Sequence, residues 1–115
     1  MLYYMNPKGR CPVEDDFLNT KKVPKAKNAQ LAVLIQRYAR EGEINNDELC
    51  HRLKGRVRDF WVLKRYQHRL YFFKETEETI IITHGIVKQR DELEVEEEDR
   101  MLLMRDTYNN LNLYK

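Results

Sequence analysis

The chain has 115 residues, of which 42% are hydrophobic and 35% are charged, and its formal net charge is +2. This length and apolar content fit one folded domain over residues 1–115 and argue against a wholly disordered chain. No apolar run approaches the roughly 18 residues of a membrane helix, and the first ten residues lack the apolar stretch of a signal peptide, so we expect a soluble cytoplasmic protein.

The N-terminal half predicts a short strand over residues 2–5, a short helix over 12–18 and a longer helix over 24–41. The strand is apolar and aromatic and ends at an Asn-Pro pair, and each helix has a proline in its first turn. A turn over 44–47 and a brief helical turn over 49–53 follow. The longer helix depends on four apolar residues spaced as one helical stripe and on a glycine at its C-cap: Leu31, Leu34, Ile35, Tyr38 and Gly42.

The C-terminal half predicts three successive strands and a helix. Alternating and β-prone residues indicate strands over 56–64, 68–73 and 79–83, the last of which ends at His84-Gly85. Acidic residues over 91–99 favour the N-terminus of the final helix. The apolar stripe of that helix is Met101, Met104, Tyr108 and Leu111.

This order of elements predicts an α+β fold. We expect a small, mostly antiparallel sheet made of the short N-terminal strand and the three-strand meander. Helices pack on one face of this sheet, and a C-terminal helix completes the domain.

The net charge conceals a segregation of charge along the chain. Residues 50–90 carry ten basic and four acidic side chains, a net charge of +6, whereas 91–99 contain seven acids. Such asymmetry is typical of a polyanion-binding face beside a solvated segment, although two ordinary solvated surfaces would give the same pattern. We interpret the acids as the start of the last helix.

The basic residues fall on the predicted meander, where Arg58 and Lys64 share one strand face and Arg69 lies on the next strand. His84 closes the third strand, and Lys88 follows it. Cations beside aromatic rings suit single-stranded nucleic acid, because cations contact phosphates and rings stack on bases. In the alternative interpretation, the rings belong to the core and the cations are solvated.

RNA cleavage needs no metal if the 2′-hydroxyl is the nucleophile, so we expect no metal and no cofactor. The reaction needs a base, an acid and cations that stabilise the phosphorane, and histidine titrates near neutral pH. His84 and His68 are the candidates for proton transfer, while His51 is expected to be structural. Cys11 and Cys50 have neither disulfide nor zinc spacing and are expected to be buried thiols.

Three segments carry a resemblance to a known family: 61–64 (Trp-Val-Leu-Lys), 68–73 (His-Arg-Leu-Tyr-Phe-Phe) and 80–88 (Ile-Ile-Ile-Thr-His-Gly-Ile-Val-Lys). Upstream, Cys11-Pro12-Val13 and Phe17-Leu18 are similar to the first helix of the same family. The chain resembles the RelE/HigB toxin superfamily over residues 2–110, and more narrowly its phage-derived, HigB-like branch. The resemblance implies a toxin of a type II toxin–antitoxin pair that cleaves mRNA in the ribosomal decoding site and is neutralised by a helix-turn-helix antitoxin.

The resemblance also implies site residues. Lys64 takes the place of a strand-end arginine, Arg69 or His68 that of a strand arginine, and the end of the third strand matches a His-Gly-x-x-Lys motif. The catalytic residues implied are Arg69, His84, Lys88, Lys64 and His68. The nucleic-acid-binding residues expected are Arg56, Arg58, Arg65, Tyr71 and Arg90.

The sequence departs from the family pattern at three places. Val62 stands in place of a glutamate, Gln89 in place of a second lysine with Arg90 after it, and acids replace a Thr-Pro pair before the last helix. These changes reduce the positive charge on the C-terminal side of the expected site. Two alternative functions therefore stay open: a ParE-like toxin that acts on a protein target, and a non-catalytic, phage-derived interaction domain of the same fold.

Overall fold

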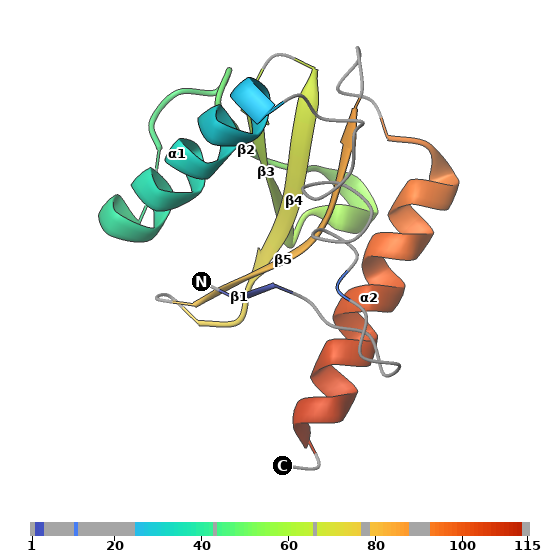
Figure 1. Cartoon of the computed structure of the whole chain (residues 1–115). Coiled ribbons are helices and arrows are strands. Elements are labelled where there is room, and N and C mark those ends of the chain that lie inside the picture. Colours follow the sequence, from blue (N-terminus) through green and yellow to red (C-terminus); the bar gives the residue numbers. More distant parts are fainter. Residues whose placement is uncertain are drawn as a thin grey trace.

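The computed structural model describes residues 2–3, 11, 25–42, 44–65, 67–76, 79–87 and 93–113 (Figure 1). Its elements are β1 (Leu2–Tyr3), α1 (Lys25–Glu41), β2 (Cys50–Arg52), the 3-10 helix η2 (Gly55–Val57), β3 (Phe60–Arg65), β4 (His68–Lys74), β5 (Ile80–Val87) and α2 (Val95–Leu113). Within these residues, no helix is long and apolar enough to cross a membrane.

The strands form one sheet in the order β1-β5-β4-β3-β2. Consecutive strands from β2 to β5 pair antiparallel, and β1 adds to the free edge of β5 as a parallel strand. The predicted α+β class and the mostly antiparallel sheet are confirmed. The predicted strand over 2–5 is described only at residues 2–3, and the predicted helix over 12–18 lies outside the described residues.

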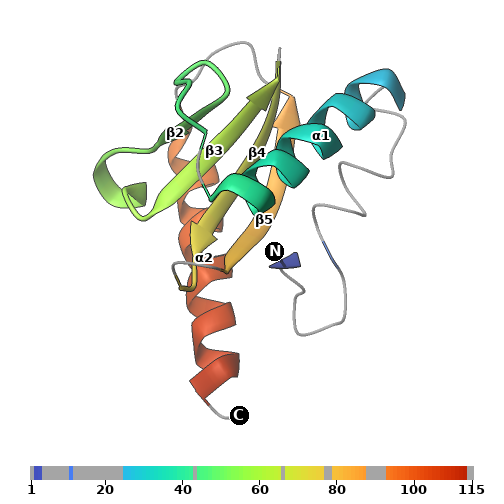
Figure 2. The ribbon, with the colours of Figure 1, turned by 90° about the vertical axis from the view of Figure 1, so that its left-hand side faces the viewer.

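The two helices cover opposite faces of the sheet, with α1 in front of the strands and α2 behind them in Figure 2. Because side chains alternate along a strand, β4 supplies Leu70 and Phe72 to one face and Tyr71 and Phe73 to the other. On the α1 face the buried partners include Leu31, Leu34, Ile35, Tyr38, Leu63 and Ile82. On the α2 face they include Phe60, Val62, Ile81, Met101 and Met104. The expectation that the helices pack on one face is wrong for α2, because Met101 and Met104 pack with Tyr71 and Phe73 on the face opposite α1.

The α1 helix confirms the stripe predicted for residues 24–41. All four predicted apolar residues are buried against the sheet, and the ring of Tyr38 meets the edge of the Phe72 ring at a centroid distance of 5.0 Å. Gly42 follows the helix with a φ of +76°, and its N–H donates to the Tyr38 carbonyl at 2.8 Å. This left-handed residue closes the helix, as a C-cap glycine does.

We expect Gly42→Ala to lower the free energy of unfolding by about 1–2 kcal/mol, because a left-handed backbone is strained for residues with a Cβ atom. Apart from its chain neighbours, no atom of the described residues lies within 4 Å of the position that the Cβ would take, so the cost comes from the backbone and not from a clash. Chemical denaturation measures this difference. Gly42→Asn is the matched control and should lose less, since asparagine tolerates this conformation better; an equal loss in both variants would contradict the explanation.

Two segments between α1 and the sheet differ from the prediction. The brief helical turn expected over 49–53 is wrong: the N–H groups of Leu49 and Cys50 both donate to the Asn46 carbonyl in a turn, and the chain then extends as β2. The strand expected over 56–64 begins only at Phe60, because Gly55 adopts a φ of +67° and starts η2. Arg58 therefore lies in a turn and does not share a strand face with Lys64.

The third strand of the meander is longer than predicted. It was expected to end at His84-Gly85, but β5 continues to Val87, since its last four residues pair with the first four of β4. The final helix begins at Val95, with three glutamates in its first turn, which confirms the acids as a helix start. Of the predicted stripe, Met101 and Met104 are buried and Tyr108 packs on the same cluster, whereas Leu111 is exposed.

Candidate functional site

Three of the predicted catalytic residues lie on one face of the sheet. The β3–β4 register pairs Lys64 with Arg69, and the β4–β5 register pairs Arg69 with Ile86 and Tyr71 with His84. Directly opposed residues of antiparallel strands project to the same side, here the side that α2 covers. The exposed fractions of Lys64, Arg69 and His84 are 8%, 7% and 3%, so the cluster is almost completely buried.

A β-bulge brings His84 to this face. The register steps from the Phe72–Ile82 pair to the Tyr71–His84 pair, so that Thr83 is the extra residue of β5. The His84 ring then stacks on the Tyr71 ring, with centroids 5.0 Å apart and planes 23° apart. Tyr71 is thus itself buried under the helix layer, although it was expected to bind nucleic acid.

Thr83 fixes the tautomer of His84. The Thr83 hydroxyl donates to the Tyr71 carbonyl at 3.1 Å, and its oxygen lies 3.0 Å from His84 Nδ1. A hydroxyl has one hydrogen, so Nδ1 must donate to the Thr83 oxygen. The neutral imidazole therefore carries its proton on Nδ1 and presents an unprotonated Nε2.

Burial lowers the pKa of His84 to about 3, and the positive charge of Arg100 on α2 contributes to the same shift. At neutral pH the ring is uncharged in this environment. His84 can accept a proton at Nε2 but does not hold one as an imidazolium acid. The site therefore places a neutral proton acceptor on the same sheet face as Lys64 and Arg69.

The other predicted site residues lie elsewhere. His68 is buried, but it shares the face of Leu70 and is separated from His84 by the sheet. Arg65 pairs with His68 at the same end of the β3–β4 hairpin. Lys88 and Arg90 lie outside the described residues.

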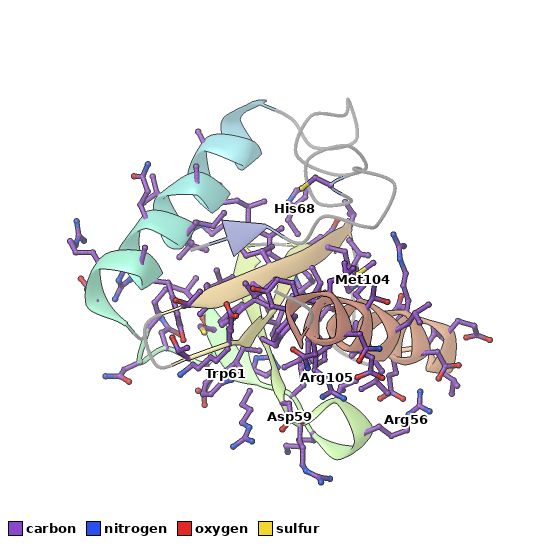
Figure 3. The ribbon with its side chains drawn as sticks, turned by 90° about the horizontal axis from the view of Figure 1, so that it is seen from below. Arg56, Asp59, Trp61, His68, Met104 and Arg105 are labelled. Atoms are coloured by element: carbon purple, nitrogen blue, oxygen red, sulfur yellow. The ribbon has the colours of Figure 1, made fainter. Side chains whose placement is uncertain are left out.

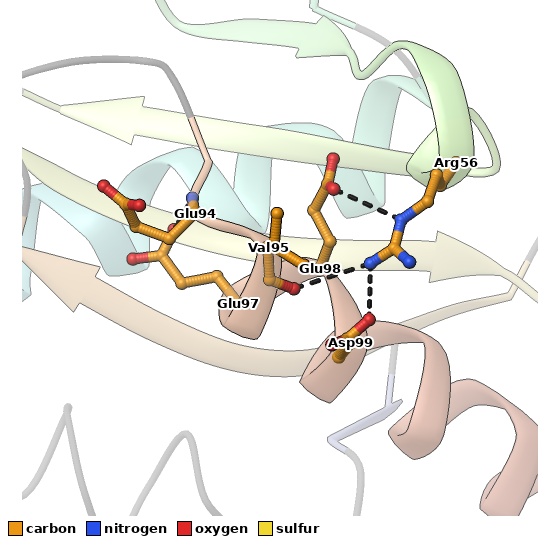
Figure 4. A network of polar contacts seen from close by, with 6 residues as sticks. All are labelled: Arg56, Glu94, Val95, Glu97, Glu98 and Asp99. Carbon is orange, nitrogen blue, oxygen red and sulfur yellow. Dashed lines mark hydrogen bonds and ion pairs between the residues drawn. The ribbon is translucent and has the colours of Figure 1, made fainter.

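Arg56, which was expected to bind nucleic acid, contacts the start of α2 (Figure 4). Its Nε donates to Glu98 Oε1 at 3.3 Å, and its Nη2 donates to Asp99 Oδ1 at 2.5 Å and to the Val95 carbonyl at 3.5 Å. The hydrogen bond with Asp99 is the main reason why the pKa of Arg56 is raised. Exposed ion pairs of this kind contribute little to stability, so these acids engage Arg56 without anchoring the helix.

Two residues that position the site were missed in the sequence. Thr83 orients His84, and Arg100 places a charge near its ring. A threonine before the histidine was visible in the sequence, but nothing there indicated a bulge. No signal could have found Arg100, because its position depends on which face α2 covers.

The cysteines are confirmed as buried free thiols. Burial raises the pKa of Cys50 to about 11, so this thiol is protonated at neutral pH and is a poor nucleophile. Within the described ranges, no group of three or more His, Cys, Asp or Glu side chains is placed to hold a metal ion.

The fold is similar to that of a chain in the RelB–RelE antitoxin–toxin complex from Methanococcus jannaschii. The TM-score is 0.53 at 14% sequence identity, and the similarity covers 76% of this chain and 89% of that chain. No family model and no curated protein matches the sequence. The chain thus has a RelE-like fold, and at this identity the likeness concerns the fold alone.

Proposed function

We propose that this chain is the toxin of a type II toxin–antitoxin pair and that it cleaves ribosome-bound mRNA through the 2′-hydroxyl. The RelE-like fold supports the toxin class. The observation that carries the cleavage chemistry is the gathering of Lys64, Arg69 and His84 on one sheet face. We also propose, from the sequence motifs alone, that the chain belongs to the HigB-like, phage-derived branch of these toxins.

In the proposed reaction, the α2 face opens and rehydrates His84, which removes the burial that lowers its pKa and restores its basicity. His84 Nε2 then accepts the proton of the 2′-hydroxyl, and the resulting oxygen attacks the adjacent phosphate. Arg69 and Lys64 then stabilise the negative charge that develops on the phosphorane. The leaving 5′-oxygen takes a proton from a donor that we leave unassigned. Since the three side chains are nearly buried, the α2 face must open before RNA can reach them.

The proposed partners are mRNA on the ribosome and an antitoxin. The neighbouring structure is that of an antitoxin–toxin complex, which supports a protein partner that neutralises this chain. We infer from the sequence resemblance that the antitoxin is a helix-turn-helix protein. A toxin that acts on ribosomes works in the cytoplasm.

Induced expression of the chain without its antitoxin should arrest growth and translation and produce mRNA fragments. Arg69→Ala should reduce cleavage about 10²–10³-fold and His84→Ala about 10²–10⁴-fold, as expected for the loss of a charge stabiliser and of a general base. His51→Ala is the matched control on β2 and should leave cleavage unchanged. Circular dichroism verifies that each variant folds. Unaffected growth with the wild-type chain, or full toxicity of the Arg69→Ala/His84→Ala double variant, would contradict the proposal.

One observation favours a second candidate, a non-catalytic interaction domain of the same fold. Every described member of the proposed catalytic cluster is less than 10% exposed. A chain of this kind would bind its protein partner with no effect on growth. The same expression experiment separates the two functions, because binding of the partner without toxicity would support the interaction domain.

A further inference from the structure

An arginine interrupts the apolar stripe that α2 turns towards the sheet. Met101, Met104 and Tyr108 pack in the cluster between the helix and the sheet. Arg105 lies on the same side of α2, because it is four residues after Met101 and three before Tyr108. Its guanidinium group is 5.9 Å from the centroid of the buried Phe60 ring, and its side chain is only 22% exposed. The helix is therefore attached to the sheet partly through a charged residue.

The charge of Arg105 is balanced by two carboxylates that belong to different segments. Its Nη1 donates to Asp59 Oδ2 at 2.9 Å, and its Nη2 donates to Asp106 Oδ1 at 3.5 Å. Asp106 is part of α2 itself, whereas Asp59 lies in the turn directly before β3. The contact with Asp59 therefore ties α2 to the connection between β2 and β3. Figure 3 shows Arg105 between Met104 and Asp59.

The rest of the contact between α2 and the sheet is small. Among the described residues of this helix, only Met101 and Met104 are buried, whereas the apolar residues Leu103 and Leu111 are exposed. The contacts of Arg56 with the start of α2 are exposed ion pairs, which contribute little to stability. An element with few buried apolar contacts detaches at a lower free energy than the central strands of a sheet.

Arg105 makes the attachment of α2 depend on the negative charge of Asp59. A largely covered guanidinium group has lost most of its hydration, and a carboxylate beside it compensates for that loss. When the Asp59 carboxylate is missing, the group gains hydration by moving into water, and α2 moves with it. Because Asp106 belongs to α2, its pair with Arg105 favours neither the attached nor the detached helix. Asp59 and Arg105 both line a hollow of about 630 Å³ that is open to solvent, so dissolved ions reach and screen their pair.

We propose that α2 is an autoinhibitory cover, which the pair of Arg105 and Asp59 holds over the proposed catalytic cluster. Lys64, Arg69 and His84 lie on the sheet face beneath α2 and are less than 10% exposed, so the attached helix excludes a substrate from them. Loss of the pair releases the helix and uncovers these side chains. The consequence for mRNA cleavage rests on the proposed function, whereas the release of α2 is measurable without RNA.

The three histidines of the intact chain report the position of α2, because diethyl pyrocarbonate modifies accessible, neutral imidazole rings. His84 lies beneath α2, whereas His68 is buried on the α1 face and His51 is partly exposed on β2. Peptide mass spectrometry near neutral pH follows the modification of each ring. Detachment of α2 should expose His84 alone, while unfolding of the whole domain exposes His84 and His68 together. The rate at His51 calibrates the reagent.

Asp59→Asn removes the carboxylate and leaves the charge of Arg105 in place. His84 should then react about 10-fold faster than in the wild-type chain, the factor expected for the loss of one hydrogen bond to a charged group. Arg105→Met makes the stripe apolar throughout, so His84 should stay as protected as in the wild type. The Asp59→Asn/Arg105→Met double variant should regain this protection, because no charged group is left that must be hydrated.

Salt and a matched variant provide the controls. Raised salt should speed the reaction of His84 in the wild-type chain but not in Arg105→Met, since only the wild type has this pair to screen. Arg37→Gln removes an exposed ion pair with Glu41 on α1 and should leave the rate at His84 unchanged.

The possible results separate this inference from the proposed function. Equal rates at His84 in the wild type and in Asp59→Asn overturn the cover, and so does a faster rate that Arg105→Met fails to reverse. Equal acceleration at His84 and His68 also overturns it, because the whole domain would then unfold. Selective exposure of His84 that Arg105→Met reverses supports the cover even if the chain proves unable to cleave mRNA. If the chain does cleave, Asp59→Asn should raise the cleavage rate by the same factor, and an unchanged rate would overturn the autoinhibitory role.

Discussion

Met101→Ala should lower the free energy of unfolding by about 2–5 kcal/mol, the range for truncation of a large buried aliphatic side chain. Met101 is completely buried and joins α2 to the cluster that contains Tyr71, Phe73 and Ile81. Its truncation leaves a cavity at the contact that holds this helix over the sheet. Urea denaturation followed by circular dichroism measures the loss.

Leu103→Ala is the matched control for this substitution. Leu103 lies on the same helix two residues later but is 67% exposed, so its truncation should change stability by less than about 0.5 kcal/mol. An equal loss of free energy in both variants would contradict the packing of α2 on the sheet through Met101. A selective loss in Met101→Ala would confirm that this contact holds α2 against the sheet.

Acidification from pH 7 to pH 5 should cost about 2 kcal/mol of stability through His84 alone. The pKa of His84 is lowered from 6.5 to about 3 in the folded chain. Between these values the unfolded chain binds one more proton than the folded chain at this residue. The stabilisation is therefore complete above pH 6.5 and is lost as the pH falls towards 3, by about 1.4 kcal/mol per pH unit once the unfolded chain is protonated.

Unfolding experiments at several pH values between 5 and 7 test this linkage, in a range where most carboxylates stay ionised. His84→Leu should remove the His84 contribution and flatten the pH dependence by that amount. His51→Gln, on β2, should leave the slope unchanged. A His84→Leu variant with the same pH slope as the wild type would show that His84 is not the buried neutral group described above.

The fold could be predicted from the sequence where a long segment has a clear period. The α1 stripe was visible because its apolar residues recur every third to fourth position, and β4 was visible as a continuous run of apolar and aromatic residues, which the structure buries on both faces of the sheet. The short β2 strand was not visible, since three residues are too few to show a period and Gly55 interrupts the extended pattern after it. The face that α2 covers depends on tertiary packing, which the sequence pattern of that helix does not record.

The candidate site could be predicted in its residue types but not in its geometry. The sequence left the match of Arg69 or His68 open, and the hairpin register places Arg69, and not His68, on the sheet face of Lys64. A shift of one residue would have exchanged the two side chains between faces. The burial of the cluster and the bulge before His84 arise from contacts between distant segments, so neither could be read from local patterns.

The extra residue in β5 divides that strand into two halves with independent alternation. Up to Ile82, even-numbered residues face α1 and odd-numbered residues face α2. From His84 onward the alternation is reversed, so that His84 and Ile86 face α2. Without this bulge, Thr83 would itself pair with Tyr71 under α2, and the imidazole of His84 would point to the α1 layer. The position of the bulge in β5, more than the identity of any side chain, therefore determines which face of the sheet His84 occupies.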